Sequence, residues 1–244
     1  MSHRRRGAQA PKFVRLYGRH AVAAALANPE RLPLRLYATR EAAAALGPPP
    51  GVQIQWGDMA DLGKLIPADA AHQGLVLEVE PLPGEHLEDL LLRPGNGPLV
   101  VLDQVTDPGN VGAIMRSSAA FGAVGVVTQD RHAPPESGAL AKAASGALEV
   151  LPWARVVNLA RALDQIAEAG FWRIGLDGRA QRLLEDALGT ARPALVLGAE
   201  GEGMRPNTAA HVDELARLPI GNAVESLNVS TAAACALYAC ARRA

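Results

Sequence analysis

The chain contains 244 residues, of which 49% are hydrophobic and 20% are charged, and its formal net charge is −1. These proportions are typical of a folded protein with a hydrophobic core, and they exclude an intrinsically disordered chain. They also exclude a uniformly basic nucleic-acid-binding protein.

The first twenty residues depart from this balance. They contain no Asp or Glu but six basic residues, namely Arg4, Arg5, Arg6, Lys12, Arg15 and Arg19. Such a basic arm attracts the phosphates of a nucleic acid, because binding releases condensed counterions. A solubilising tail has the same composition, so the arm alone leaves both interpretations open.

Cysteine and histidine usage gives no sign of a disulfide framework or a metal site. Cys235 and Cys240 are the only cysteines, and the six histidines are scattered without ligand spacing. No apolar run approaches membrane-spanning length, and no signal-peptide core follows the basic start. We therefore expect a cytoplasmic protein with reduced thiols, without a metal and without a membrane anchor.

The first part of the chain predicts a small α/β domain. Its apolar patterns predict two helices and three strands, at residues 20–29 (helix), 34–39 (strand), 41–46 (helix), 52–56 (strand) and 74–80 (strand). Trp56 ends the strand at 52–56, and we expect it to pack inside this domain. The Pro- and Gly-containing segment 93–98 is the best linker candidate. We thus divide the chain into an arm (1–14), a first domain (15–92), the linker (93–98) and a second domain (99–244).

The second part predicts longer units of the same kind. Short apolar strands alternate with amphipathic helices: strands at 98–103, 123–129, 172–177, 193–200 and 214–220, and helices near 110–121, 136–147 and 155–170. This alternation predicts a parallel sheet covered by helices on both faces. In such sheets ligands bind beyond the carboxyl ends of the strands, so the polar motifs of interest are expected in those loops.

The first such loop is LDQVTDPGNVGAIMRSSAAFG, residues 102–122. Asp107 or Asn110 is a suitable N-cap for the helix that follows, and Gly122 is a suitable stop. Arg116 is the unusual residue, because the rest of its helix is largely apolar. It either reaches solvent along its aliphatic stem or serves a site.

The second loop is ALVLGAEGEGMRP, residues 194–206, in which a buried strand leads into glycines 198, 201 and 203. Its spacing does not match the dinucleotide fingerprint. Glu200 and Glu202 would repel a pyrophosphate, so an adenosine ligand without phosphates and with a positive charge fits better. S-adenosylmethionine is such a ligand, although a tight turn with solvated glutamates would have the same sequence.

The third loop is LPIGNAVESLNVS, residues 218–230, which precedes an alanine-rich helix. We expect Ser226 to cap this helix and Asn228 and Ser230 to lie in its first turn, among free backbone N–H groups. Polar side chains beside open donors are suited to an oxygen-bearing ligand. Local hydrogen bonding to the backbone is the alternative.

Together these three loops resemble the sequence motifs of the SpoU-type RNA 2′-O-ribose methyltransferases of the SPOUT superfamily. The resemblance covers residues 97–244 and is carried by NVGAIMR (110–116), LGAEGEGM (197–204) and LPIGNAVESLNVS (218–230). In the first part, LYGRHAVAAALANP (16–29) and HQGLVLEV (72–79) are similar to the family's small RNA-binding domain, which has a ribosomal-protein-like fold. A chain with both parts is most similar to 23S ribosomal RNA guanosine-2′-O-methyltransferases.

The resemblance implies a trefoil knot in the carboxyl-terminal domain, a homodimer and S-adenosylmethionine as methyl donor. It implies that the cofactor site is lined by Leu197, Gly198, Gly203, Ile220 and Leu227. It implies that the catalytic site is formed by Asn110, Arg116, Glu200, Ser226 and Asn228. Arg116 would stand at the dimer interface and either accept the proton of the ribose hydroxyl or hold that hydroxyl beside a phosphate. In this context the basic arm is expected to bind the RNA backbone.

Three alternatives to ribosomal RNA methylation remain at this point. The same reaction on transfer RNA is the nearest. A non-catalytic RNA-binding protein of the same fold is the second, and the polar residues of the three motifs argue against it. A nicotinamide-dependent oxidoreductase is the third, and the glutamates of the second loop argue against it.

Overall fold

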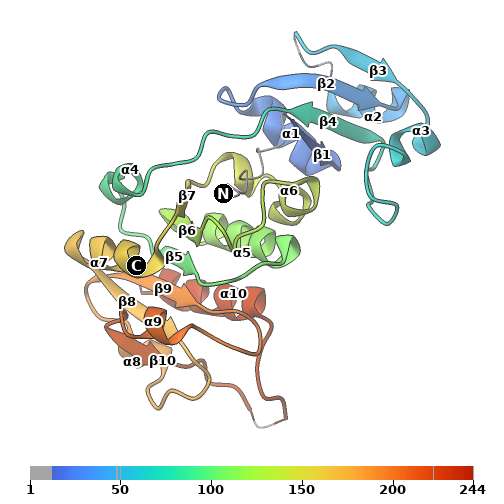
Figure 1. Ribbon diagram of the computed structural model, residues 1–244. Helices are drawn as coiled ribbons and strands as arrows, with labels where there is room; N and C mark the ends of the chain where they lie inside the picture. Colours follow the sequence, from blue (N-terminus) through green and yellow to red (C-terminus); the bar gives the residue numbers. More distant parts are fainter. Residues whose placement is uncertain (1–12, 48, 50, 222, 244) are drawn as a thin grey trace, which may run out of the picture. The chain divides into compact units, whose positions relative to one another are not determined.

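The structure is a computed structural model that describes residues 13–47, 49, 51–221 and 223–243 (Figure 1). The chain divides into two compact units, unit 1 (Met1–Leu82) and unit 2 (Pro83–Ala244). The boundary thus precedes the expected linker at 93–98. The reason is that Leu87 and Leu90 of helix α4 (Leu87–Leu92) are buried in the same cluster as Leu99 and Val101 of strand β5 (Leu99–Leu102). The Pro and Gly residues of 93–98 mark a loop between two packed elements.

Unit 1 contains a four-stranded sheet with three helices among its described residues. Its elements in chain order are β1 (Val14–Tyr17), α1 (Arg19–Ala27), β2 (Pro33–Ala38), α2 (Arg40–Leu46), β3 (Ile54–Trp56), α3 (Met59–Gly63) and β4 (Leu75–Val79). The strand order is β1-β4-β2-β3. Strand β4 is antiparallel to β1 and β2, whereas β2 and β3 are parallel. These elements include β1 and α3, which the sequence analysis did not predict.

The core of unit 1 is built around the central strand β4, whose five residues are all buried. One buried cluster joins Tyr17, Tyr37 and Leu62 to Val76 of this strand. Trp56 does not pack inside the unit as expected: it ends the edge strand β3 and is 50% exposed. A strand at the edge of a sheet leaves part of its last side chain uncovered.

Unit 2 contains a six-stranded sheet whose recorded strand pairs are all parallel, in the order β10-β8-β9-β5-β6-β7. The elements after β5 are α5 (Pro108–Ala120), β6 (Gly125–Gln129), α6 (Gly138–Ala144), a 3-10 turn (Ala147–Glu149), β7 (Trp153–Val156), α7 (Leu159–Glu168), β8 (Phe171–Leu176), α8 (Leu184–Ala187), β9 (Arg192–Leu197), α9 (Pro206–Ala209), β10 (Glu214–Ala216) and α10 (Val229–Ala241). The predicted parallel sheet is confirmed.

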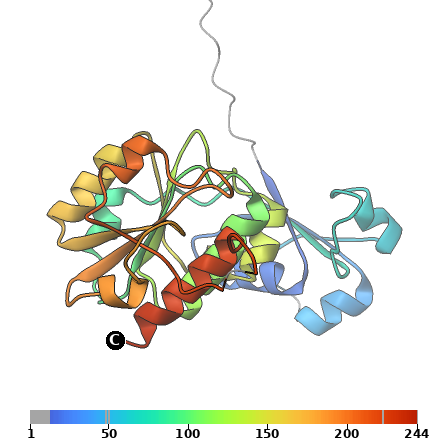
Figure 2. The same ribbon diagram turned by 90° about the horizontal axis from the view of Figure 1, so that it is seen from below.

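Helices cover both faces of the unit 2 sheet (Figures 1 and 2). Helices α4 and α7 share a buried cluster with Leu99 and Val101, the alternate residues of β5. Helices α5, α6 and α10 pack together on the opposite face, where α10 and α6 both contact α5. The central strand β5 is therefore buried on both sides, as its run of four apolar residues indicates.

The expected helix at 155–170 is wrong at its beginning. Residues 153–156 form strand β7, and the helix starts at Leu159 after its N-cap Asn158, which accepts a hydrogen bond from the backbone N–H of Arg161. The apolar residues Val156 and Val157 fit a helical period by chance, but the Asn cap sets the true start.

Within the described part of the chain, no helix combines the length and apolar character needed to span a membrane. The same residues contain no group of three or more His, Cys, Asp or Glu side chains able to hold a metal ion. Cys235 and Cys240 are free thiols, the first exposed and the second buried.

Candidate active site

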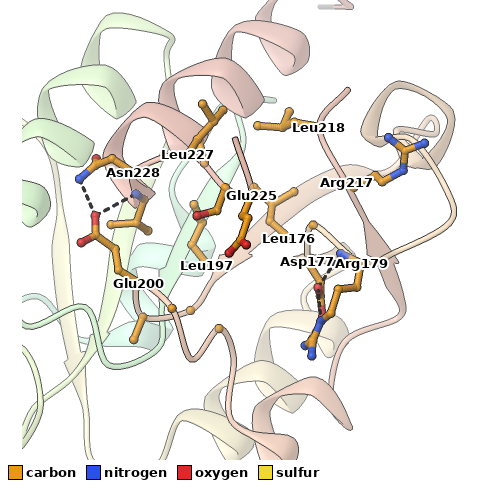
Figure 3. Close-up of a pocket in the computed structure, with 18 of the residues that line it drawn as sticks. Leu176, Asp177, Arg179, Leu197, Glu200, Arg217, Leu218, Glu225, Leu227 and Asn228 are labelled. Carbon is orange, nitrogen blue, oxygen red and sulfur yellow. Dashed lines mark hydrogen bonds and ion pairs between the residues drawn. The ribbon is translucent and has the colours of Figure 1, made fainter. Parts of the chain in front are cut away.

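A pocket of about 770 Å³ lies beyond the carboxyl ends of strands β8, β9 and β10 (Figure 3). Parallel strands end at the same edge of a sheet, so loops that are distant in sequence meet there. The pocket is lined by the ends of these strands, by the loops after them and by the beginning of α10: Leu176–Arg179, Leu197–Gly203, Ala216–Leu218, Ile220, Glu225–Val229 and Ala232.

Three polar side chains form a hydrogen-bonded cluster at one end of the pocket: Asn110, Glu200 and Asn228, of which Figure 3 shows Glu200 and Asn228. The Glu200 Oε1 atom accepts hydrogen bonds from Asn110 Nδ2 at 3.3 Å and from the Val229 backbone N–H at 3.3 Å. It also accepts one from Asn228 Nδ2. Asn228 Nδ2 lies 3.0 Å from Asn110 Oδ1 as well. The carboxylate therefore fixes both amides at this end of the pocket.

The beginning of α10 explains why Asn228 is held so firmly. Asn228 is the N-cap of this helix, and its Oδ1 accepts from the backbone N–H groups of Ser230 at 2.9 Å and Thr231 at 3.3 Å. The expectation that Ser226 caps the helix is thus wrong, because the helix begins two residues later. The Asn228 oxygen caps the helix, and the Asn228 amide nitrogen donates to Glu200. The orientation of this side chain is therefore fixed before any ligand binds.

The loop after β9 turns back tightly on itself. Ala199 and Gly203 exchange two backbone hydrogen bonds, at 3.1 and 2.9 Å. A Cβ atom on Gly198 would lie 2.0 Å from the backbone carbon of Gly203, so a side chain at this position is excluded. Gly203 itself has φ +72°, which other residues rarely adopt. The glycines thus shape the turn that carries Glu200.

An ion pair between a buried carboxylate and a partly exposed guanidinium anchors the far end of this loop. The Asp103 side chain is fully buried directly after β5, and it accepts hydrogen bonds from the backbone N–H and the Nε of Arg205, at 2.9 and 2.8 Å. Arg205 Nη2 also donates to Gln129 Oε1, at 2.8 Å, at the end of β6. Three neighbouring strands, β5, β6 and β9, are linked in this way just beyond their carboxyl ends.

In the middle of the pocket leucines lie beside Glu225, and a charged pair stands at its other end. Figure 3 shows Leu176, Leu197 and Leu227 between the Glu200–Asn228 cluster and the pair formed by Asp177 and Arg179. Arg179 Nη2 lies 2.9 Å from Asp177 Oδ2, and these hydrogen bonds lower the pKa of the Asp177 carboxyl. The pocket can therefore hold a ligand with an apolar centre and polar ends.

The structure brings most of the sequence-predicted residues together. The expected cofactor residues, Leu197, Gly198, Gly203, Ile220 and Leu227, all line the pocket. Of the expected catalytic residues, Glu200, Ser226 and Asn228 line it, and Asn110 joins through its hydrogen bonds. What these residues do chemically remains a prediction.

Arg116 lies apart from this pocket in its own chain. Its side chain is exposed, it does not line the pocket, and it makes no hydrogen bond or ion pair with any residue that the structure describes. Arg116 follows Asn110 by six positions on α5, and at about 100° per residue the two point roughly 120° apart around the helix.

The predicted RNA-binding arginines and lysine divide into three groups. Arg4, Arg5, Arg6 and Lys12 lie outside the described residues. Arg15 forms a 3.0 Å ion pair with Glu78 and donates to the Leu65 carbonyl, so its guanidinium is engaged within unit 1. Arg19 is exposed at the start of α1.

Several pocket residues were missed by sequence reasoning. Asp177 and Arg179 follow β8, a strand that was predicted, so the rule on carboxyl ends could have found them. Asp103 gave a further signal, because a charged residue comes directly after a fully apolar strand. Its partner Arg205 is 102 positions away and had no local signal.

Comparison with known proteins places this geometry in a family. Residues 97–238 match the model of the SpoU rRNA Methylase family. The chain is 38% identical over 240 residues to the 23S rRNA (guanosine-2′-O-)-methyltransferase RlmB of Pasteurella multocida, which covers 93% of this chain and 97% of that relative. RlmB of Pseudomonas aeruginosa is 42% identical over 175 residues, which covers 70% of this chain and 71% of the relative.

Solved structures share the fold over almost the whole chain. The SpoU methyltransferase AviRb from Streptomyces viridochromogenes, solved in complex with AdoMet, matches with a TM-score of 0.80 at 24% identity, covering 95% of this chain and 90% of that one. A TrmH-family protein from Porphyromonas gingivalis matches with a TM-score of 0.76 at 27% identity, covering 96% and 91%. The fold and the pocket define a parallel α/β enzyme. The chain belongs to the SpoU rRNA methylase family.

Proposed function

We propose that this protein transfers a methyl group from S-adenosylmethionine to the ribose 2′-hydroxyl of a guanosine in 23S ribosomal RNA. The observation that carries the proposal is the Asn110–Glu200–Asn228 cluster at one end of a ligand-sized pocket. The RlmB relatives, which match unit 1 as well as unit 2 in Pasteurella multocida, support ribosomal RNA as the substrate.

The residues of the pocket fit S-adenosylmethionine. Leu197, Ile220 and Leu227 offer an apolar surface for an adenosine, and the glutamates of the loop suit a cation and would repel a phosphate. When bound, this cofactor supplies a methyl group activated by its sulfonium. The chain itself therefore needs neither an acid for the leaving group nor a metal.

The remaining task of the protein is to position and deprotonate the ribose hydroxyl. Asn110 and Asn228 are fixed by Glu200 at this end of the pocket, and the second amide N–H and the remaining oxygen lone pair of Asn110 can orient a hydroxyl. In one route Arg116 of a second copy first loses a proton, helped by a nearby phosphate, and then accepts the proton of the hydroxyl. In the other route Arg116 stays charged and holds the hydroxyl beside an RNA phosphate, and the proton passes to that phosphate or to solvent. A guanidinium is ordinarily charged, so the second role places the smaller demand on it.

This mechanism requires a homodimer, because Arg116 lies apart from the pocket of its own chain. We further propose that unit 1 binds RNA through a ribosomal-protein-like fold, aided by the basic arm. The carboxyl-terminal segment that carries Asn228 would pass through a trefoil knot, and the protein would act in the cytoplasm. The solved relatives share the fold in which this arrangement is expected.

The test is methylation of unmodified 23S rRNA transcript by the purified protein, with mass-spectrometric mapping of the methylated ribose. We expect one 2′-O-methylguanosine, and no product with Arg116→Lys if the planar guanidinium is required. If transfer RNA were methylated and the 23S rRNA transcript were not, transfer RNA would be the substrate. No ribose methylation on either RNA would contradict the proposal.

A further inference from the structure

Trp56 presents an unusually open aromatic surface on unit 1. It is the last residue of the edge strand β3, and it is 50% exposed. The guanidinium carbon of Arg40, at the start of α2, lies 5.2 Å from the centroid of the Trp56 ring. A cation thus stacks on an aromatic ring that is itself half open to solvent.

The Arg40–Trp56 stack differs from the Arg155–Trp153 stack of unit 2, which further polar bonds hold in place. In unit 2, Arg155 covers the ring of Trp153 at 4.9 Å, but Arg155 is paired with Asp130 and the Trp153 indole donates a hydrogen bond to a threonine. Among the described residues, the side chains of Arg40 and Trp56 have no hydrogen bond or ion pair. Both remain available to a ligand.

We propose that Trp56 and Arg40 form a stacking site for an unpaired nucleobase of the RNA substrate. Unpaired RNA bases bind proteins by stacking on aromatic rings and on guanidinium planes, which are the two groups present here. The inference rests on the proposed function, since it concerns how that RNA is held away from the pocket.

The charges around Trp56 favour a base over a phosphate as the occupant. Asp58 and Asp61 follow Trp56 closely in sequence, and Glu41 follows Arg40. Asp58 accepts the Asp61 backbone N–H at 2.8 Å, and Asp61 is paired with Lys64 at 2.9 Å. The surroundings of the ring are therefore mixed in charge. Affinity at this site comes from stacking, which depends weakly on salt.

Exposed Arg19 lies at the same edge of the sheet and offers the phosphate contact. Strands β1 and β2 run in the same direction, because both are antiparallel to β4, and β3 is parallel to β2. The carboxyl ends of all three strands therefore lie on the same side of the sheet. Arg19 follows β1 there, and Trp56 is the last residue of β3. Three strand spacings of about 4.8 Å separate β1 from β3, which leaves room for two or three nucleotides.

The experiment measures binding of unmodified 23S rRNA transcript to the full chain at several salt concentrations. We expect Trp56→Ala to weaken binding roughly 5- to 100-fold without changing the slope of log Kd against log salt. Trp56→Phe should retain most of the affinity. Arg19→Ala should weaken binding and lower the slope by about one. The matched control is Trp172→Ala, which removes a 41% exposed tryptophan of unit 2 and should bind RNA normally.

The outcomes separate this inference from the proposed function. Unchanged RNA affinity in Trp56→Ala, or a loss that appears only as a changed salt slope, would overturn the stacking site even if the enzyme methylates RNA normally. Absence of methylation by the unaltered protein would instead contradict the proposed function, and the binding comparison would still decide the stacking site. Urea unfolding of the full chain followed by circular dichroism, which responds to both units, checks that each variant is folded. If Trp56→Ala fails this check, Trp56→Met replaces it, because Met keeps apolar volume without a planar ring.

Discussion

The two sheets of this protein place their functional side chains differently. In unit 2 the parallel strands end at one edge, and the loops after β5, β9 and β10 join Asn110, Glu200 and Asn228 into one cluster. In unit 1 the central strand is antiparallel to two of its neighbours, and Trp56 lies open at the end of an edge strand. The parallel sheet of unit 2 thus brings its polar loops together around a pocket, whereas the mixed sheet of unit 1 leaves an aromatic side chain exposed on its surface. Changes in unit 2 should therefore affect catalysis, and changes in unit 1 should affect RNA binding alone.

The largest effect should come from Asp103→Ala, which breaks the ion pair between Asp103 and Arg205. Removal of the carboxylate takes away the acceptor of the Nε and of the backbone N–H of Arg205, whereas Nη2 keeps its hydrogen bond to Gln129, so we expect a loss of about 3 kcal/mol in the free energy of unfolding. The loop that carries Glu200 also loses its anchor, so the affinity for S-adenosylmethionine should fall. Urea unfolding and calorimetry measure the two effects. Gln129→Ala is the matched control, with an expected loss of about 1 kcal/mol.

Glu200→Gln should follow, with a fall of about 100-fold in kcat. The Glu200 Oε1 atom accepts from Asn110, Asn228 and the Val229 N–H, and an amide oxygen in its place carries no negative charge, so all three hydrogen bonds become weaker. The two asparagines would then be held less firmly. Single-turnover methyl transfer at saturating substrates measures the change. Glu168→Gln, on the exposed side of α7, should leave kcat as it is. If the kcat of the Glu200→Gln enzyme were unchanged, the carboxylate would not be required for methyl transfer.

Loss of a helix cap should sharpen the contrast between the units. Thr39 Oγ1 caps α2 in unit 1 by accepting from Ala42 N–H at 3.2 Å, and Asn228 caps α10 in unit 2. Thr39→Ala and Asn228→Ala should each lower the free energy of unfolding by about 1 kcal/mol. Only Asn228→Ala should also slow methyl transfer. Asn228→Ser retains a capping oxygen but not the amide donor, so its stability should recover while its activity does not.

The smallest effect concerns the two thiols of α10. Burial raises the pKa of the Cys240 thiol to about 11, whereas Cys235 is exposed. The thiolate is the reactive form, so at pH 8 roughly one Cys240 in a thousand is ionised. Iodoacetamide should therefore modify Cys235 first, as peptide mass spectrometry would show. Rapid alkylation of Cys240 in the folded protein would mean that α10 detaches readily from α5 and β9.

The sheet of unit 2 and the residues around its pocket followed from local patterns. Buried apolar runs identified β5, β8 and β9, and the rule that ligands bind at carboxyl ends directed attention to Glu200 and Asn228. Strand β7 was missed because its four residues lead without a glycine or proline into α7, and the two apolar patterns merge. The order of the strands was not readable from sequence, because it depends on contacts between distant segments.

Long-range partners and exposure were the features least accessible from sequence. The Asp103–Arg205 pair joins residues that no spacing rule connects. Trp56 looked like a packing residue because tryptophan usually is one, and only its position on an edge strand shows otherwise. The division between the units at Leu82 differs from the expected linker at 93–98, because Pro and Gly also occur in short loops and Leu90 of α4 is buried in a cluster of unit 2.

The strand order of unit 2 has a consequence for synthesis of the protein on the ribosome. Strand β5 pairs with β6 on one side and with β9 on the other, and about ninety residues separate the end of β5 from the start of β9. At about 5–20 residues per second, translation leaves one hydrogen-bonding edge of β5 unpaired for roughly 5–20 s. An apolar strand with a free edge is prone to pair with other chains. Nascent chains of this enzyme should therefore depend on chaperones until β9 emerges.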